Sequence, residues 1–264
     1  MSKAFDELMA TMRRLRAPGG CPWDREQTHS SLAPYLLEEC YETFEAIEKA
    51  EKENNKTALK EELGDVLLQV VFHSVIAEEN GDFTIDEIIN GINEKLILRH
   101  PHVFGDKRFT TASEVLQNWD KLKANEREKR GKKAKDSLLD NVPASFPALM
   151  EALKLTKEAS KVGFDWENAE QVFEKLEEEI KELKEAIKKG EKTHVEEEIG
   201  DLLFAVVNLA RKLGIEPETA LKRTNRKFRT RFGKIEEELK ASGKRLEEAK
   251  LSEMDELWEK AKHS

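Results

Sequence analysis

Residues 61–71 read EELGDVLLQVV, and residues 197–207 read EEIGDLLFAVV. Each string joins acids to a run of apolar residues, with a glycine directly before the aspartate. An apolar run that continues for several turns without the alternation of a half-buried strand is typical of a buried helix. The chain therefore contains one apolar helix in two versions, and each version begins beside carboxylates.

The repeat extends well beyond these strings. EECYE at 38–42 returns as EEEIKE at 177–182, NEKLILR at 93–99 returns as NRKFRTR at 225–231, and NWDKLK at 118–123 returns as LWEKAK at 257–262. Matched blocks in the same order indicate an internal duplication. We predict an N-terminal domain at 1–125 and a C-terminal domain at 137–264, joined by a charged linker at 126–136.

Composition favours an all-α fold. Charged residues make up 38% of the 264 residues, Gly and Pro are scarce, and strand-type alternation is almost absent. Apolar periodicity predicts helices at about 3–17, 31–52, 57–79 and 85–99, and again at about 146–161, 169–188, 194–213 and 217–241. A short last helix carries Trp119 or Trp258. Short connections imply antiparallel neighbours, so each half is expected to be a four-helix-bundle-like unit.

Local signals mark several ends of these helices. A hydroxyl residue followed three positions later by Glu predicts a capping box at Thr84/Glu87, Thr111/Glu114 and Thr193/Glu196. Helix-ending signals stand at Asn54-Asn55 and at Gly190, and Pro217 suits a first helical turn.

Charge and cysteine content exclude several classes of protein. The net charge is −9, so stable nucleic-acid binding is not expected. Cys21 and Cys40 match no metal-binding spacing and are expected to be reduced thiols. The N-terminus lacks the apolar core of a signal peptide, and no apolar run is long enough to span a membrane. We expect a cytoplasmic protein.

The carboxylates recur at spacings that bring them together. Glu179 and Glu182 share one helix face, as do Glu198 and Asp201 on the next helix. Gly190 lies midway between Glu182 and Glu198, so both pairs stand at the same height of an antiparallel hairpin. The first half repeats the pattern with Glu39, Glu42, Glu62 and Asp65. The apolar residues after each aspartate predict a central helix buried on all sides.

Such a cluster requires neutralisation, because neighbouring carboxylates repel one another when they are partly desolvated. Oxygen ligands without Cys or His are typical of Mg²⁺, with Mn²⁺ as an alternative. Gly64 and Gly200 suggest the close approach of a neighbouring backbone or ligand. A di-iron bundle is the rival metal site, but its Glu-x-x-His pairs, Glu26/His29 and Glu191/His194, stand at helix starts away from the cluster. A solvated surface face is the ordinary interpretation of the remaining acids Glu45, Glu48, Glu185 and Glu196.

Cations recur one helix further on. Lys95 and Arg99 are four apart, and Lys227 and Arg231 repeat that spacing. A salt-bridged surface would account for either pair alone, but the repetition favours a role in binding phosphate. Trp119 and Trp258 suit either stacking on a base or a role in helix capping or dimer packing.

These motifs together resemble the MazG family of nucleoside triphosphate pyrophosphohydrolases. The similarity covers nearly the whole chain and is most specific at GGCPWDREQTHSSLAPYLLEECYE, EELGDVLLQVVFHS and EEEIGDLLFAVVNLARKLG. It implies Mg²⁺-dependent hydrolysis of a nucleoside triphosphate to a monophosphate and pyrophosphate, broad base specificity, a homodimer, and a role in nucleotide-pool housecleaning or stress regulation. A nucleotide-binding regulatory bundle without turnover is the alternative function, and a phosphohydrolase of another class is a third.

The family also implies roles for individual residues. Glu38 and Glu178 match the leading acid, which positions or activates water. The metal ligands would be Glu39, Glu42, Glu62, Asp65, Glu179, Glu182, Glu198 and Asp201. Lys175, Lys227, Arg231 and Trp258 match positions linked to nucleotide binding, and Arg99 and Lys123 match functional basic positions of the first half. Lys95 is expected to join the substrate-binding residues from its spacing to Arg99 alone.

Overall fold

The computed structural model describes residues 2–53, 56–131 and 137–263. The chain divides into two compact units, Met1–Lys133 and Ala134–Ser264. Every regular element of the described residues is a helix, which confirms the all-α class. The exact boundaries of the linker remain a prediction.

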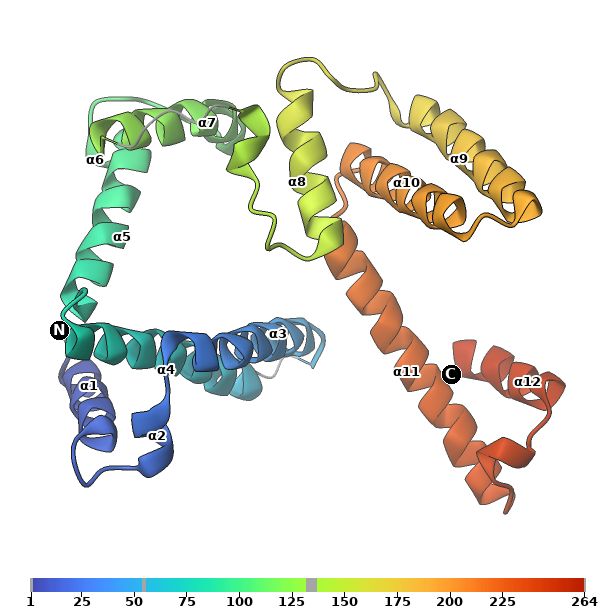
Figure 1. Cartoon of the computed structure of the whole chain (residues 1–264), viewed down its shortest axis with the longest axis horizontal. Coiled ribbons are helices and arrows are strands. Elements are labelled where there is room, and N and C mark those ends of the chain that lie inside the picture. Colours follow the sequence, from blue (N-terminus) through green and yellow to red (C-terminus); the bar gives the residue numbers. More distant parts are fainter. Residues whose placement is uncertain (1, 54–55, 132–136, 264) are drawn as a thin grey trace. The chain divides into compact units, whose positions relative to one another are not determined.

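The described part of the first unit forms seven α-helices, which follow one another along the chain (Figure 1): α1 (Lys3–Arg16), α2 (Pro22–Glu26), α3 (His29–Glu53), α4 (Thr57–Asn80), α5 (Ile85–Arg99), α6 (Pro101–Phe104) and α7 (Ala112–Lys129). The second unit repeats the long helices: α8 (Ala148–Ser160), α9 (Ala169–Lys189), α10 (Lys192–Lys212), α11 (Pro217–Ala241) and α12 (Leu251–Lys262), with the 3₁₀ turns η1 (Leu138–Asn141) and η2 (Leu246–Glu248). Sequence periodicity predicted each long helix to within a few residues, but it did not predict α2, α6 or the 3₁₀ turns.

The helix ends show which local signals operate. Capping boxes form at Thr84 with Glu87 and at Thr111 with Glu114, as predicted. The box predicted at Thr193 is wrong, because α10 begins at Lys192 and its cap residue Glu191 makes no side-chain cap. Pro217 opens α11, as predicted. The predicted stop at Asn54-Asn55 lies outside the described residues.

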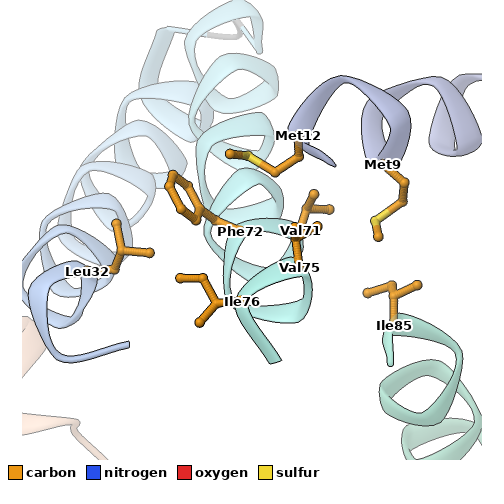
Figure 2. Packing of buried hydrophobic residues seen from close by; sticks show 8 residues of the cluster. All are labelled: Met9, Met12, Leu32, Val71, Phe72, Val75, Ile76 and Ile85. Atoms are coloured by element: carbon orange, nitrogen blue, oxygen red, sulfur yellow. The ribbon is translucent and has the colours of Figure 1, made fainter. Parts of the chain in front are cut away.

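The core of the first unit lies where α1, α3, α4 and α5 meet. Figure 2 shows Met9 and Met12 from α1 directed at the α4 side chains, with Leu32 of α3 and Ile85 of α5 on other sides. Eight buried residues form the cluster: Met9, Met12, Leu32, Val71, Phe72, Val75, Ile76 and Ile85. At about 25 cal/mol per Å² of apolar area removed from water, a cluster of this kind is the main source of stability of a helical unit. The core is built on the second half of α4, beyond the acids.

The acid-bearing half of α4 departs from the predicted burial. Leu63, Leu67 and Val70 are 53%, 40% and 38% exposed, although periodicity predicted a helix buried on all sides. On α10 the corresponding apolar face is also open, with Leu203 at 52% and Val206 at 47%. The cause is the position of the long helix that follows each hairpin: as far as the structure describes the chain, α3 makes no contact with α5, and α9 makes none with α11. Each unit thus presents an apolar face that its own helices leave uncovered.

The start of the predicted linker is helical. Helix α7 runs to Lys129, and Glu126 within it is only 3% exposed. The remainder of the predicted segment includes residues 132–136, which lie outside the described residues.

None of the described helices combines the length and the apolar character needed to cross a membrane. Cys21 and Cys40 are both free thiols, as predicted.

Candidate functional site: carboxylate clusters on two helical hairpins

The clearest cluster lies on the hairpin of α9 and α10. Gly190 ends α9 in the left-handed conformation at φ 73° and turns the chain within two residues into α10. Helices α9 and α10 lie side by side (Figure 1), and one carboxylate oxygen each of Glu179, Glu182 and Glu198 lies within 4.8 Å of the others. The prediction that the acids of the two helices stand at the same height of the hairpin is therefore correct for these three side chains.

The first unit repeats this arrangement on α3 and α4. Carboxylate oxygens of Glu39, Glu42 and Glu62 lie within 4.8 Å of one another. The hydroxyl of Thr43 donates to the carbonyl oxygen of Glu62 at 3.3 Å, which ties the two helices together beside the cluster. Two hairpins with the same three carboxylates give the chain two candidate metal centres.

The aspartates stand apart from these groups of three. Asp65 and Asp201 are both exposed, whereas the sequence placed them inside a bundle among apolar neighbours. That prediction was wrong because the apolar face around them is uncovered in one chain. Asp65 is still close enough to act electrostatically, since its charge raises the pKa of Glu39 and of Glu62.

The electrostatics of the clusters favour a bound cation. Partial burial, followed by repulsion from Asp65, Glu42 and Glu62, raises the pKa of Glu39. Burial and then the charges of Glu179 and Glu198 raise the pKa of Glu182. Carboxyls with raised pKa values are in an environment that disfavours their charged form, and a divalent cation reverses that preference.

One atom in particular is suited to a metal. Oε2 of Glu198 is buried and has no hydrogen-bond partner among the described residues, although the side chain lies within the cluster. A buried carboxylate oxygen without a partner is costly. The donor set consists of carboxylate oxygens, so the residues fit a hard cation such as Mg²⁺ or Mn²⁺.

Lys175 supplies the second cluster with a cation of its own. Its Nζ atom lies 2.8 Å from Glu178 and 2.7 Å from Glu179. These contacts raise the pKa of Lys175, so the side chain remains charged. The corresponding position in the first unit, four residues before Glu39, is Tyr35, which meets Trp23 edge to face at a centroid distance of 6.0 Å. The leading acids Glu38 and Glu178 are both exposed.

The predicted cations of the first unit form an aromatic-lined group on α5 and α7. The guanidinium of Arg99 and the Nζ atom of Lys123 lie 6.0 and 5.9 Å from the ring centroid of Trp119. Arg99 also pairs with Glu126 at 3.1 Å, and Lys95 is near enough to lower the pKa of that carboxyl.

The second unit repeats the group on α11 and α12. Arg231 lies over the ring of Trp258 at 5.6 Å, and Phe228 meets the same ring at 5.2 Å. Lys227 is exposed on α11. Among the described residues α9 contacts neither α11 nor α12, and α10 contacts α11, the helix that follows it, but not α12, so the Arg231–Trp258 group lies apart from the carboxylates of this unit within one chain. The prediction that the two groups face each other is therefore not met by a single chain.

Two features of the sites escaped the sequence analysis. His194 was placed away from the cluster, but its Nδ1 atom lies 3.5 Å from Glu198. Its position four residues before Glu198 on one helix is the signal that could have revealed this. Glu48 was interpreted as a solvated acid and is only 5% exposed. Glu45, Glu185 and Glu196 are exposed, as predicted.

Gly64 and Gly200 are the remaining site features from the sequence. A Cβ atom added at either glycine would meet nothing within 4 Å, so no neighbouring backbone of the described chain approaches them. Glycine in a helix costs about 0.5–1 kcal/mol relative to alanine. Because the space beside Gly64 and Gly200 is open, packing within the described chain does not account for this cost.

Fold and clusters define a class: an all-α protein of two repeated units, each with three clustered carboxylates on a helical hairpin. Comparison with known families then places the chain. The family described as the MazG nucleotide pyrophosphohydrolase domain matches residues 27–104 and 167–235, segments that contain all the clustered carboxylates. The chain belongs to the MazG family.

Curated relatives agree over nearly the full length. The chain is 52% identical to the nucleoside triphosphate pyrophosphohydrolase/pyrophosphatase MazG of Thermotoga maritima, over 98% of this chain and 95% of the relative. It is 44% identical to the nucleoside triphosphate pyrophosphohydrolase of Escherichia coli K12, over 98% and 97%. A 48% identity to the Bacillus subtilis protein YabN covers 98% of this chain and 52% of that longer protein.

Proposed function

We propose that this protein hydrolyses nucleoside triphosphates to nucleoside monophosphates and pyrophosphate. The observation that carries the proposal is the duplicated hairpin with three convergent carboxylates in each unit, found in a chain of the MazG family. Curated relatives at 52% and 44% identity are named for the same reaction.

The carboxylates account for metal binding. Glu39, Glu42 and Glu62 would hold Mg²⁺ in the first unit, and Glu179, Glu182 and Glu198 would do so in the second, with Asp65 and Asp201 as further ligands. Mn²⁺ has the same ligand preference. The bound ion would neutralise charge on the triphosphate.

The remaining residues have distinct tasks. Glu178 is exposed beside the cluster and held by Lys175, a position from which it would orient a water molecule for in-line attack on the α-phosphorus. Glu38 would do the same in the first unit. The cation groups, Lys95, Arg99 and Lys123 in one unit and Lys227, Arg231 and Trp258 in the other, would bind the phosphates and the base.

We infer that the active form is a homodimer. The uncovered apolar faces of α4 and α10, together with the open space at Gly64 and Gly200, support packing against a second copy. In such a dimer the cation group of one chain would also meet the carboxylates of the other chain, whereas the two groups lie apart within a single chain. Leu203→Glu, placed on the uncovered face, should convert the dimer to a monomer in light-scattering chromatography.

Cellular setting and other partners remain proposals. We propose a cytoplasmic location, where nucleoside triphosphates are available, and no stable binding to nucleic acid, in accordance with the net charge of −9.

Product analysis tests the proposed reaction. The purified protein is incubated with dTTP and Mg²⁺, and the products are separated by ion exchange. Formation of dTMP and pyrophosphate in equal amounts supports the proposal, whereas release of single phosphates contradicts it. Tight binding without products would instead favour a regulatory nucleotide-binding protein. A parallel incubation with dTDP separates a diphosphatase from the proposed activity.

A further inference from the structure

In the first unit a buried carboxylate, that of Glu126, pairs with Arg99, the arginine proposed to bind phosphate. Glu126 is 3% exposed, and its carboxylate accepts from Arg99 at 3.1 Å and contacts Arg130 at 3.3 Å. Burial by itself would raise the pKa of Glu126, but Arg99, Arg130 and Lys95 together lower it. The carboxylate is therefore charged; it pairs with Arg99 and lies within electrostatic reach of Lys95.

The second unit provides an internal comparison. Arg231 corresponds to Arg99 and also lies over a tryptophan ring, at 5.6 Å from the centroid. Within the described ranges Arg231 forms no ion pair with a carboxylate, although its charge acts after that of Lys262 in lowering the pKa of Glu259. Since a tryptophan ring is enough to hold the arginine there, the additional carboxylate in the first unit is not required to orient it.

We propose that Glu126 sets the phosphate affinity of the first unit by competing with the triphosphate for Arg99. This inference rests on the proposed function, since it assumes that Arg99 binds phosphate. A phosphate can form forked hydrogen bonds to Arg99 only after the Arg99–Glu126 bond opens. The negative charge of Glu126, 3.1 Å from the Arg99 guanidinium, also repels the approaching anion. The first unit would then bind triphosphate more weakly than its cations alone allow.

Glu126→Gln tests the competition in the full-length chain. The variant is made in a Glu179→Gln, Glu182→Gln background, which silences the second cluster, and binding of a triphosphate with a non-hydrolysable α–β bridge is measured by calorimetry with Mg²⁺. Glutamine retains the shape and removes the charge, so we expect about tenfold tighter binding. Glu94→Gln is the matched control: Glu94 contacts Arg130 at 3.5 Å but not Arg99, and its removal should change the affinity less than about twofold.

Stability measurements separate competition from a structural role. Loss of Glu126 leaves Arg99 and Arg130 without their shared carboxylate, so thermal stability should fall while affinity rises. If Glu126 had only a structural role, its loss would reduce both the thermal stability and the affinity for triphosphate. If Glu126→Gln fails to fold by circular dichroism, Glu126→Asp, which withdraws the carboxylate by one methylene, should still tighten binding.

Several results would overturn the proposal. They are unchanged, weaker or undetectable binding in the folded Glu126 variant, and an equal gain in the Glu94 control. Product analysis of the wild-type chain is independent of these results, so failure of the proposed reaction would be recognised separately.

Discussion

The Nδ1 atoms of His29 and His73 lie 2.8 Å apart, within hydrogen-bonding distance, and the ring planes of the two residues differ by 7°. The ring centroids are 5.1 Å apart, and the two ring planes are nearly parallel. The centroid separation is larger than the distance between the nitrogens, so the rings meet edge to edge through their Nδ1 atoms rather than face to face. One imidazole donates N–H and the other accepts, and the bond joins the first residue of α3 to α4.

This pair predicts that the first unit weakens in acid. Burial and then His29 lower the pKa of His73, so the stability that this pair contributes is present above about pH 6.5 and is lost as the pH falls through the lower folded-state value. Thermal unfolding of the wild type between pH 7.5 and 5 should show this loss, and His73→Gln should reduce it. An exposed-site control, His263→Gln, should behave like the wild type; if all three proteins respond alike, the pair is not the cause.

A second prediction concerns the acid cluster without metal. The pKa of Glu182 is raised, so its ionisation opposes folding, and stability falls as the pH rises through that value. Glu182→Gln should therefore raise the melting temperature at pH 7 in EDTA. It should also reduce the further rise that Mg²⁺ produces in the wild type. Calorimetric scans with and without the ion measure both effects, and a lower melting temperature in EDTA would refute the repulsion.

Turnover should depend on the second cluster. Glu179→Gln with Glu182→Gln removes two of three convergent carboxylates, and we expect at least about a hundredfold loss of dTTP hydrolysis. The matched double variant, Glu39→Gln with Glu42→Gln, removes the corresponding pair in the first unit. Equal rates for the wild type and the second-unit variant would assign the reaction to the first unit.

The separation of charges within one chain predicts complementation between two inactive variants. Arg231→Ala would remove a proposed phosphate ligand, and Glu179→Gln with Glu182→Gln would remove proposed metal ligands, so in the proposed dimer each variant by itself should be nearly inactive. Co-expressed subunits of the proposed dimer would form mixed dimers, in which one site would combine intact carboxylates with an intact Arg231. Recovery of about a quarter or more of the wild-type rate would show that the site is shared. No recovery in verified mixed dimers would place each site within one chain.

The sequence predicted regular structure more accurately than burial. The spacing of Glu179, Glu182 and Glu198 around Gly190 identified the hairpin, because helical rise and turn chemistry are local properties. The exposure of Leu67 and Asp65 could not be predicted, because both depend on whether a distant helix returns to cover α4. Periodicity shows that a face is apolar, but it does not show which chain covers it.

The site was predicted in part for the same reason. Carboxylates on adjacent helices converged as expected, and the Arg231–Trp258 contact also joins two helices that follow one another. The prediction that these groups face each other required long-range placement, which spacing does not supply. Glu126 was missed because its position in a charged run indicated solvent rather than a buried partner for Arg99.

Lys175, one turn before the second cluster, makes the two hairpins differ in charge. Lys175 already balances part of the negative charge there, whereas the first hairpin carries Tyr35, a ring without charge, at the same place. We expect the two hairpins to load magnesium at different concentrations, so that a fall in magnesium concentration would empty one before the other. Duplication would thereby have given a single polypeptide two thresholds for the same ion.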